Sequence, residues 1–285
     1  HYRDDLVSHP VTYVIITNPI FANALSDFID WKTEKGFNVV VGSTSEIGSS
    51  TSAIKSYLQD LYENPTDLLP APSFVLFVGD VAQVPTYNGS TGGHVTDLYY
   101  CEYTGDLIPE VYHGRMSAQN ISQLNSQISK TLEYEKYEMP DPSYLEEVLM
   151  IAGVDAGMAP TYGNGQINYG TDYYFNAAHG IYSHTYLYPA SDASGAAAAI
   201  IQDYNEGVGF ANYTAHCSPS GWADPSFTIS DVPGLANEHE YNLMIGNCCT
   251  STAFDVESFG EAVLRAENSG AVGYIGGTNS TYWNE

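Results

Sequence analysis

Short apolar runs alternate with longer amphipathic segments along the whole chain. Runs of three to six residues rich in Val, Ile, Leu, Phe and Ala are typical of buried strands. The predicted strands are residues 12–17, 37–41, 74–78, 148–152, 210–215, 243–245 and 271–275. Apolar residues at helical spacing predict helices over residues 20–35, 52–62, 121–137, 169–178, 196–204, 230–236 and 256–266. Strands that alternate with helices in this way predict βαβ units and mainly parallel sheets.

This alternation is interrupted twice. Residues 85–118 are rich in Gly, Tyr and Asp, follow neither period, and are predicted to be irregular. Pro140-Asp141-Pro142 ends the helical pattern of residues 121–137, because proline cannot continue a helix. We therefore expect an α/β protein of two subdomains, residues 1–140 and residues 141–285.

Composition and charge limit the classes of function. Of the 285 residues, 44% are hydrophobic, which is enough to bury a core and excludes a disordered chain. The chain carries 8 Lys and Arg against 34 Asp and Glu, a net charge of −26. Such a charge repels nucleic-acid backbones and anionic lipids, and it favours cationic substrates or divalent cations. No apolar run approaches the roughly 20 residues that span a bilayer. We therefore expect neither a nucleic-acid partner nor a membrane span.

Three predicted strands of the second half are followed by residues with chemically useful side chains: Asp155, His216 and Cys249. Ligands of open parallel sheets bind beyond the carboxyl ends of the strands, so these side chains are predicted to share one rim. Cysteine proteolysis needs a thiolate that attacks a carbonyl and an imidazole that protonates the leaving amine. The residues alone leave other interpretations open: Cys248 and Cys249 as small buried residues, His216 as a structural histidine, and Asp155 as a helix N-cap or turn acid.

The cysteine content excludes some other architectures. Four cysteines, Cys101, Cys217, Cys248 and Cys249, are too few for a disulfide-framed fold, and adjacent cysteines do not readily bridge each other. No CxxC pair or Cys/His spacing of the zinc type occurs, so structural zinc is not expected. No GxGxxG follows the first predicted strand, which argues against a dinucleotide-binding domain.

Several ordered segments resemble the gingipain family of caspase-like cysteine proteases, and within it the lysine-specific branch. Near the candidate site these are Asn212-Tyr213-Thr214-Ala215-His216, Gly221-Trp222-Ala223-Asp224-Pro225 and Ile245-Gly246-Asn247-Cys248-Cys249. Elsewhere they are Trp31-Lys32-Thr33-Glu34-Lys35-Gly36-Phe37, Val95-Thr96-Asp97-Leu98-Tyr99-Tyr100, Tyr144-Leu145-Glu146-Glu147-Val148-Leu149 and Tyr282-Trp283. The resemblance covers nearly the whole chain. It implies a caspase-like three-layer αβα fold with two subdomains, each a mainly parallel sheet flanked by helices, and it places catalysis in residues 141–285.

The resemblance also assigns roles to the candidate residues. It implies that Cys249 is the nucleophile, His216 the catalytic histidine, and Asp155 the acid that orients the imidazole. The backbone N–H groups of Cys217 and Cys249 would form the oxyanion hole. The family usually has glycine directly after the histidine, where this chain has Cys217. We expect Cys217 to be an inert, partly buried thiol; the alternative is a disulfide with Cys249 that would make activity redox-dependent.

Substrate binding is assigned, again by resemblance, to Thr214, Asn247 and Trp283, in a pocket for a basic (Lys) P1 residue. The acid that gives this pocket its charge in lysine-specific relatives would fall one position beyond Glu285. We therefore expect the catalytic subdomain to be truncated at its C-terminal end. A continuation of the chain, or a second chain, would then complete the pocket.

A structural calcium site is implied next to the irregular segment. Ca²⁺ prefers six to eight oxygen ligands, and the resemblance matches such a site to Asp80, Asp106, Glu110 and the carbonyl of Ile108. Thr104 replaces an acidic residue of the family pattern, which predicts a lower affinity. We expect the calcium to stabilise the loop between the subdomains, without a part in catalysis, and we expect no organic cofactor.

The expected function is that of a secreted or surface-associated extracellular cysteine endopeptidase. It would cleave protein or peptide substrates after Lys through a thioester acyl-enzyme. Two alternatives stand beside it. One is a sorting transpeptidase of the same superfamily, which transfers the acyl group to an amine. The other is a catalytically inactive binding module, suggested by Cys217 and by the expected truncation.

Overall fold

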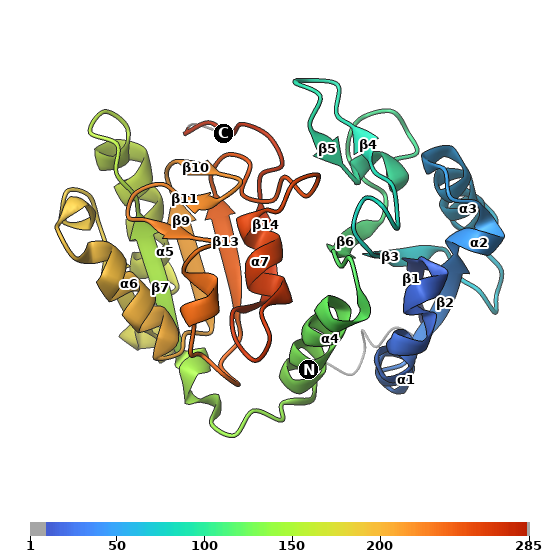
Figure 1. Cartoon of the computed structure of the whole chain (residues 1–285), viewed down its shortest axis with the longest axis horizontal. Coiled ribbons are helices and arrows are strands. Elements are labelled where there is room, and N and C mark those ends of the chain that lie inside the picture. Colours follow the sequence, from blue (N-terminus) through green and yellow to red (C-terminus); the bar gives the residue numbers. More distant parts are fainter. Residues whose placement is uncertain (1–9, 284–285) are drawn as a thin grey trace. The chain divides into compact units, whose positions relative to one another are not determined.

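The computed structural model describes residues 10–283, which form two compact units (Figure 1). The first unit ends at Ile128 and the second begins at Ser129. The division therefore lies inside helix α4 (Ile121–Lys136), whereas the sequence predicted it after this helix, at Pro140.

The first unit is built on a four-stranded parallel sheet. Its strands, in spatial order, are β2 (Phe37–Ser43), β1 (Val11–Thr17), β3 (Pro72–Val78) and β6 (Tyr112–Met116). Its main helices are α1 (Ser26–Glu34), α3 (Thr51–Glu63) and the first half of α4. Val14 and Ile16 of β1 pack in one cluster with Ile54 of α3, whereas Tyr13 contacts Phe28 of α1. Successive side chains thus bury opposite faces of the sheet under different helices.

The second unit contains a five-stranded parallel sheet. Its strands, in spatial order, are β14 (Ala271–Gly276), β13 (Asn242–Asn247), β9 (Phe210–Thr214), β7 (Glu147–Ala152) and β8 (Tyr182–Tyr186). Its helices are α5 (Asn164–Tyr173), α6 (Ala196–Asn205), α7 (Phe259–Arg265) and the second half of α4. Ile167 of α5 packs with Met150, while Ile200 of α6 and Phe259 of α7 pack in the cluster of Leu149. Because Leu149 and Met150 point to opposite faces, the sheet is covered by helices on both sides.

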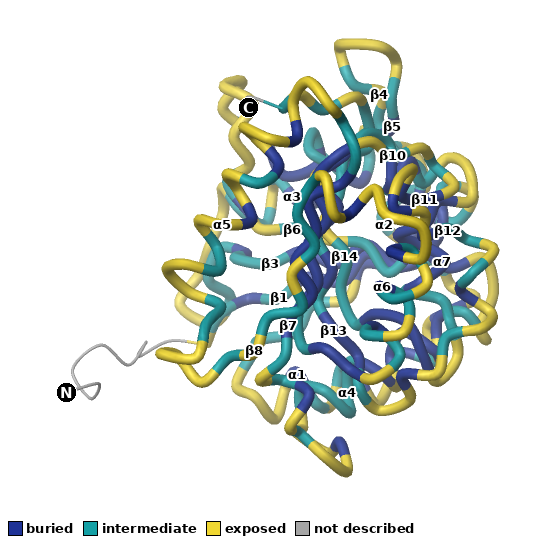
Figure 2. The backbone as a smooth tube through the Cα atoms, turned by 90° about the vertical axis from the view of Figure 1, so that its left-hand side faces the viewer, coloured by how far each residue is buried: buried dark blue, intermediate teal, exposed yellow. Residues whose placement is uncertain are grey.

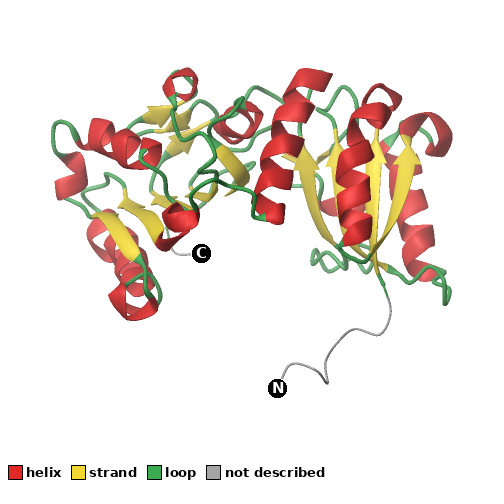
Figure 3. Ribbon diagram, turned by 90° about the horizontal axis from the view of Figure 1, so that it is seen from below, coloured by secondary structure: helices red, strands yellow, loops and turns green. Residues whose placement is uncertain are grey.

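Helices therefore lie on both sides of the parallel strands, as Figure 3 shows. In Figure 2 the buried positions follow the strands and the exposed positions follow the connecting loops. The predicted fold class, α/β with parallel sheets flanked by helices, is confirmed.

Smaller elements complete the two units. They are a hairpin of β4 (Tyr87–Asn88) and β5 (Val95–Thr96), a small antiparallel sheet of β10 (Cys217–Ser218), β11 (Gly221–Trp222) and β12 (Phe227–Thr228), and helix α2 (Thr44–Ile47). The 3-10 turns are Pro19–Leu25, Leu98–Tyr100, Pro142–Glu146, Ala177–His179, Ala190–Asp192 and Val232–Gly234, and Ala159–Gly163 forms a π turn. Within residues 10–283, none of the helices combines the length and the apolar composition needed to cross a bilayer.

Most predicted elements are present, and the differences have physical causes. Strands β6 and β8 were not predicted, because both are edge strands with mostly polar sequences and show no buried apolar run. The helix predicted over residues 230–236 is only a 3-10 turn, Val232–Gly234. Ile20 and Ile121, the apolar residues at which two of the predicted helices begin, are about half exposed.

Lys130 is a charged residue enclosed in the core of the second unit, with 2% of its surface exposed. Its ammonium donates hydrogen bonds to the carbonyls of Val263 (3.1 Å) and Ser269 (2.8 Å), whereas Gln127, one turn earlier, bonds to Ser117 of the first unit. The division falls within α4 because Gln127 bonds to the first unit and Lys130 bonds to the second. Burial without a carboxylate partner lowers the pKa of Lys130 from 10.5 to about 7.

This depressed pKa predicts a pH dependence of stability. Between pH 7 and about 10.5 the unfolded chain holds a proton on Lys130 that the folded chain has lost, so the free energy of unfolding should rise with pH, by up to about 1.4 kcal/mol per unit. Urea denaturation of the native protein and of Lys130→Met across this range measures the effect. Lys136→Met, which removes an exposed lysine from the same helix, is the control and should keep the native slope. Equal slopes for the native protein and Lys130→Met would contradict the prediction.

Candidate active site

Three neighbouring strands of the second sheet end at one level. Thr214, the last residue of β9, is paired in register with Asn247 of β13 on one side and with Ala152 of β7 on the other. His216 and Cys249 each follow two residues after this row, and Asp155 follows three residues after it. The predicted shared rim of Asp155, His216 and Cys249 is therefore present, in the strand order β7, β9, β13.

Asp155 and His216 are joined directly. The Nε2 atom of His216 lies 2.9 Å from Oδ2 of Asp155, and the imidazole is 54% exposed. The second carboxylate oxygen accepts hydrogen bonds from the backbone N–H groups of Gly157 (2.9 Å) and Met158 (3.0 Å). The His216 hydrogen bond, followed by those from Met158 and Gly157, lowers the pKa of Asp155 and keeps it ionised. Asp155 is thus a turn acid that also bonds to the imidazole, and its role as the acid that orients a catalytic histidine stays a prediction.

Hydrogen bonds to its carbonyl hold the backbone of His216 in place. Its carbonyl accepts hydrogen bonds from the N–H of Ala223 (2.9 Å) and from the hydroxyl of Tyr213 (3.0 Å). The Tyr213 ring stacks on the buried ring of Trp222, with centroids 4.6 Å apart. The backbone that carries the imidazole is therefore held by the stacked rings of Tyr213 and Trp222, which belong to the Asn212–His216 and Gly221–Pro225 segments.

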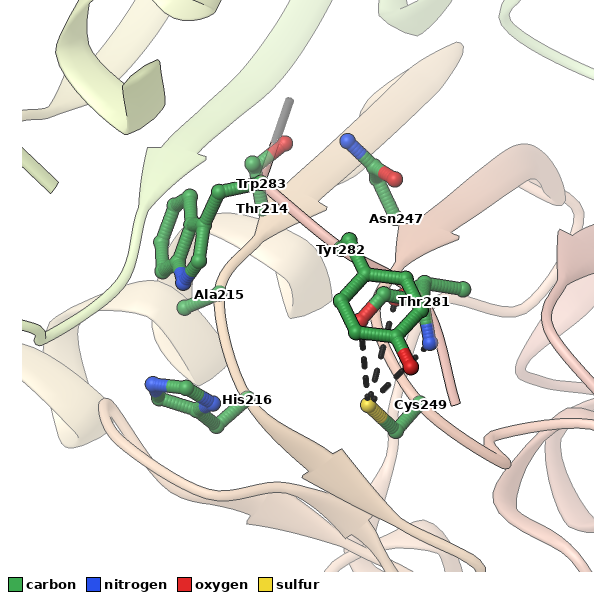
Figure 4. Close-up of a pocket in the computed structure, with 8 residues that line it drawn as sticks. All are labelled: Thr214, Ala215, His216, Asn247, Cys249, Thr281, Tyr282 and Trp283. Carbon is green, nitrogen blue, oxygen red and sulfur yellow. Dashed lines mark hydrogen bonds between the residues drawn. The ribbon is translucent and has the colours of Figure 1, made fainter. Parts of the chain in front are cut away.

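His216 and Cys249 line the same pocket, which has a volume of about 260 Å³ (Figure 4). Its lining residues are Thr214, Ala215, His216, Asn247, Cys249, Thr281, Tyr282 and Trp283. No hydrogen bond is recorded between the imidazole and the thiol; instead, the sulfur lies 3.4 Å from the N–H of Thr281. An open space bordered by both groups is what attack on a bound carbonyl requires.

The turn that carries Cys249 is constrained by its other neighbours. Thr250 has a φ of 54°, in the left-handed region that non-glycine residues rarely adopt. Its N–H bonds to the carbonyl of Asn279 at 3.0 Å, and the N–H of Thr252 bonds to Gly277 at 3.1 Å. Among residues 10–283 no acceptor faces the N–H of Cys249, one of the two predicted oxyanion donors, and its role stays a prediction.

The three predicted substrate-binding residues border this pocket. The Trp283 ring meets the His216 ring edge to face, with centroids 5.7 Å apart. It also lies over Gly163, where a Cβ atom would come 3.3 Å from the indole. Thr214 and Asn247 both donate hydrogen bonds to the side-chain oxygen of Gln166.

Gln166 was not predicted from the sequence. It lies on α5, 48 residues before Thr214, and a polar residue on an amphipathic helix carries no signal that distinguishes it from a solvent-facing one. Thr281 and Tyr282 were likewise not assigned to the site, because they follow the last strand and belong to no periodic element.

The cysteine pairing differs from both expectations for Cys217. Cys217 forms a disulfide with Cys248, with Cα atoms 5.3 Å apart, so it is neither an inert thiol nor bonded to Cys249. The pairing arises because β10 begins beside the end of β13, and connectivity of this kind cannot be deduced from spacing alone. Cys217 lies in an extended strand, so the cysteine that replaces the family glycine fits there without a left-handed backbone. Cys249 keeps a free thiol.

The predicted calcium ligands lie in the first unit. Asp80 accepts hydrogen bonds from the N–H of Val81 and from Gln119, and Glu110 accepts them from the N–H of Tyr103 and from Thr104. Asp106 accepts one from the N–H of Ile108, whose carbonyl was the fourth predicted ligand. Among residues 10–283, no three His, Cys, Asp or Glu side chains are grouped so as to hold a metal, so calcium binding stays a prediction.

Comparisons with known proteins agree with this geometry. Lys-gingipain HG66 of Porphyromonas gingivalis is 41% identical over 285 residues, which are 99% of this chain and 16% of that protein. Gingipain R2 of the same organism is 28% identical over 279 residues, 95% of this chain and 37% of that protein. A solved structure of a protease superposes with a TM-score of 0.90 at 39% identity, over 98% of this chain and 62% of the other. The Arg-specific cysteine proteinase gingipain R superposes with a TM-score of 0.82 at 26% identity, over 98% and 65%.

The chain thus spans less than two thirds of the length of these relatives. The family model described as peptidase family C25 matches residues 7–285. The sequence resemblance to the gingipains is therefore confirmed, and the chain belongs to peptidase family C25.

Proposed function

We propose that this chain is the catalytic part of a cysteine endopeptidase. One observation carries the proposal: the free thiol of Cys249 and the imidazole of His216 border one pocket, with the Asp155 carboxylate bonded to the far side of the imidazole. Membership of peptidase family C25 and the similarity to gingipains support the same conclusion.

In the proposed mechanism each ring nitrogen of His216 has its own role. Because Nε2 of His216 bonds to Asp155, Nδ1 is the nitrogen left to exchange a proton with the substrate. The Cys249 sulfur attacks the peptide carbonyl, and the imidazolium protonates the leaving amine, which leaves an acyl group on the sulfur as a thioester. His216 then takes a proton from water as the water attacks the thioester, releasing the acid and the thiol. Asp155 stabilises the imidazolium during both steps.

We further propose a basic P1 residue, with Lys preferred. Thr214 and Asn247 each donate a hydrogen bond to the Gln166 oxygen, and the Thr214 hydroxyl accepts one from Asn212. The second lone pair of that hydroxyl and the Asn247 amide oxygen are then left to accept from an ammonium group. The identity to Lys-gingipain and the net charge of −26 favour the same substrate class.

Action outside the cell is a related proposal. The Cys217–Cys248 disulfide supports it, because disulfides persist in oxidising compartments and are rare in the cytosol.

Peptide ketones that alkylate thiol proteases test the activity. An acyloxymethyl ketone with P1 Lys should modify Cys249 faster than the Arg and Ala analogues, as measured by mass spectrometry. Cys249→Ala should abolish peptide hydrolysis, and His216→Ala should lower kcat by about 10²- to 10⁴-fold through loss of proton transfer. Cys101→Ala is the control, since burial raises the pKa of that thiol to about 12 and keeps it unreactive.

The alternatives give different results in the same experiment. A protein labelled by none of the ketones would be an inactive binding module. Labelling by the Ala ketone but not by the Lys ketone would remove only the P1 assignment. Acyl transfer to an added amine in preference to water would identify a transpeptidase.

Substitution of Gln166 tests the orientation of the P1 acceptors. Gln166→Ala frees the Thr214 hydroxyl and the Asn247 amide to rotate, and the loss of one or two hydrogen bonds should reduce kcat/KM for Lys substrates by about 5- to 30-fold. Ala substrates should be affected less. Gln202→Ala, which removes a glutamine of α6 whose side chain donates to Glu206, is the matched control. A uniform loss for all P1 residues would show that Gln166 does not act through these acceptors.

Calcium binding by Asp80, Asp106, Glu110 and the Ile108 carbonyl is a separate proposal. Adding Ca²⁺ to EDTA-treated protein should raise the melting temperature, because a ligand at 100 times its Kd stabilises the folded state by about 2.7 kcal/mol. Glu110→Gln should reduce the shift, whereas Glu63→Gln, at the exposed end of α3, should not. An unchanged melting temperature in the native protein would exclude the site.

A further inference from the structure

The Cys217–Cys248 disulfide lies between the two candidate catalytic residues. Cys217 directly follows His216, and Cys248 directly precedes Cys249. Cys248 is fully buried and Cys217 is half-buried, so the bond is not an exposed surface crosslink.

Pairing between the two strands stops before the catalytic residues. The last pair in register joins Thr214 of β9 to Asn247 of β13, and both His216 and Cys249 lie beyond it. After this pair the hydrogen bonds of the two loops lead to other partners: His216 bonds to Ala223, Tyr213 and Asp155, and the sulfur of Cys249 accepts from Thr281. One hydrogen bond, from the N–H of Phe259 to the carbonyl of Pro219, ties the histidine side to α7. The disulfide is the covalent link that joins the two loops next to the reacting groups.

We propose that Cys217 and Cys248 are a positioning pair, whose disulfide holds the His216 loop and the Cys249 loop at the separation that the reaction needs. This inference rests on the proposed endopeptidase function. A shift of about 1 Å between reacting groups costs about 10²-fold in rate, and hydrogen bonds alone leave room for such shifts at the ends of strands. The bond also fixes the backbone of Cys217, whose N–H is a predicted oxyanion donor.

The position of the pair predicts which kinetic constant changes. Thr214 and Asn247 belong to the paired part of the sheet, so P1 binding does not depend on the disulfide. His216 and Cys249 lie beyond the paired part, so the chemical step does. Loss of the bond should therefore lower kcat and leave KM nearly unchanged.

Reduction should have the same effect as substitution. An added dithiol attacks one sulfur of the Cys217–Cys248 bond, which releases the other cysteine as a thiol and forms a mixed disulfide. The reagent's second thiol then attacks the reagent's own sulfur in that mixed disulfide and releases the second cysteine thiol. The protein gains two thiols and the reagent becomes a cyclic disulfide. Because Cys249 is already a free thiol, activity should fall as dithiothreitol reduces the Cys217–Cys248 bond.

The experiment compares the native protein, Cys217→Ala/Cys248→Ala and the control Cys101→Ala, each at a temperature where circular dichroism shows it folded. We expect the double variant to lose at least tenfold in kcat, with KM within twofold of native and with no further loss of activity when dithiothreitol is added. Labelling of Cys249 by a P1 Lys ketone should slow to a similar extent, and labelling by iodoacetamide should not. Cys101→Ala should match the native protein in all of these.

The outcomes separate this inference from the function on which it rests. A double variant with native kcat, or with kcat and KM altered together, would overturn the positioning role and leave the endopeptidase intact. If the double variant fails to fold, the dithiothreitol titration of the native protein decides. The positioning role is then overturned if mass spectrometry shows the bond reduced while activity does not fall. A native protein whose Cys249 reacts with iodoacetamide but with no peptide ketone would overturn the endopeptidase and the positioning role together.

Discussion

The register of three parallel strands is the constraint on which the site depends. Ala152, Thr214 and Asn247 form one row across β7, β9 and β13, and the chain leaves the sheet from each of them within three residues of Asp155, His216 and Cys249. A register slip of one residue would turn every side chain of a strand to the opposite face, and the clusters on both faces of this sheet oppose it. The packing of the hydrophobic core thus fixes the strand register that brings together an acid, an imidazole and a thiol that are far apart in sequence.

Beyond the ends of the strands, hydrogen bonds hold the side chains of the site in place. Asp155 shows how one residue can satisfy both a turn and the imidazole, since one carboxylate oxygen caps the following backbone while the other accepts from His216. The cap fixes the carboxylate, and the fixed carboxylate then decides which ring nitrogen of His216 faces the pocket. Gln166 also serves two residues, because its side-chain oxygen accepts hydrogen bonds from both Thr214 and Asn247 and so orients them.

The sequence predicted the parts of this arrangement that follow from periodicity. Buried strands such as β1, β3 and β7 were predicted because both of their faces are apolar, and the rule on strand ends then brought Asp155, His216 and Cys249 together. Edge strands β6 and β8 were missed because their outer side needs no apolar residues. Gln166 and the Cys217–Cys248 pairing could not be predicted, because each depends on which loops become neighbours after folding and leaves no mark on local sequence. The choice of Cys249 over Cys248 came from family resemblance, and the structure agrees in leaving Cys249 as the free thiol.

The wall of the pocket formed by Thr281, Tyr282 and Trp283 comes from a part of the chain that contributes neither acid, imidazole nor thiol. It follows β14, the edge strand of the sheet, so its sequence can vary without disturbing the central strands. A change at Tyr282 or Trp283 would therefore alter the surface of the pocket and leave Thr214 on β9 and Asn247 on β13 unchanged, whereas a change at Thr281 would also act on the Cys249 sulfur.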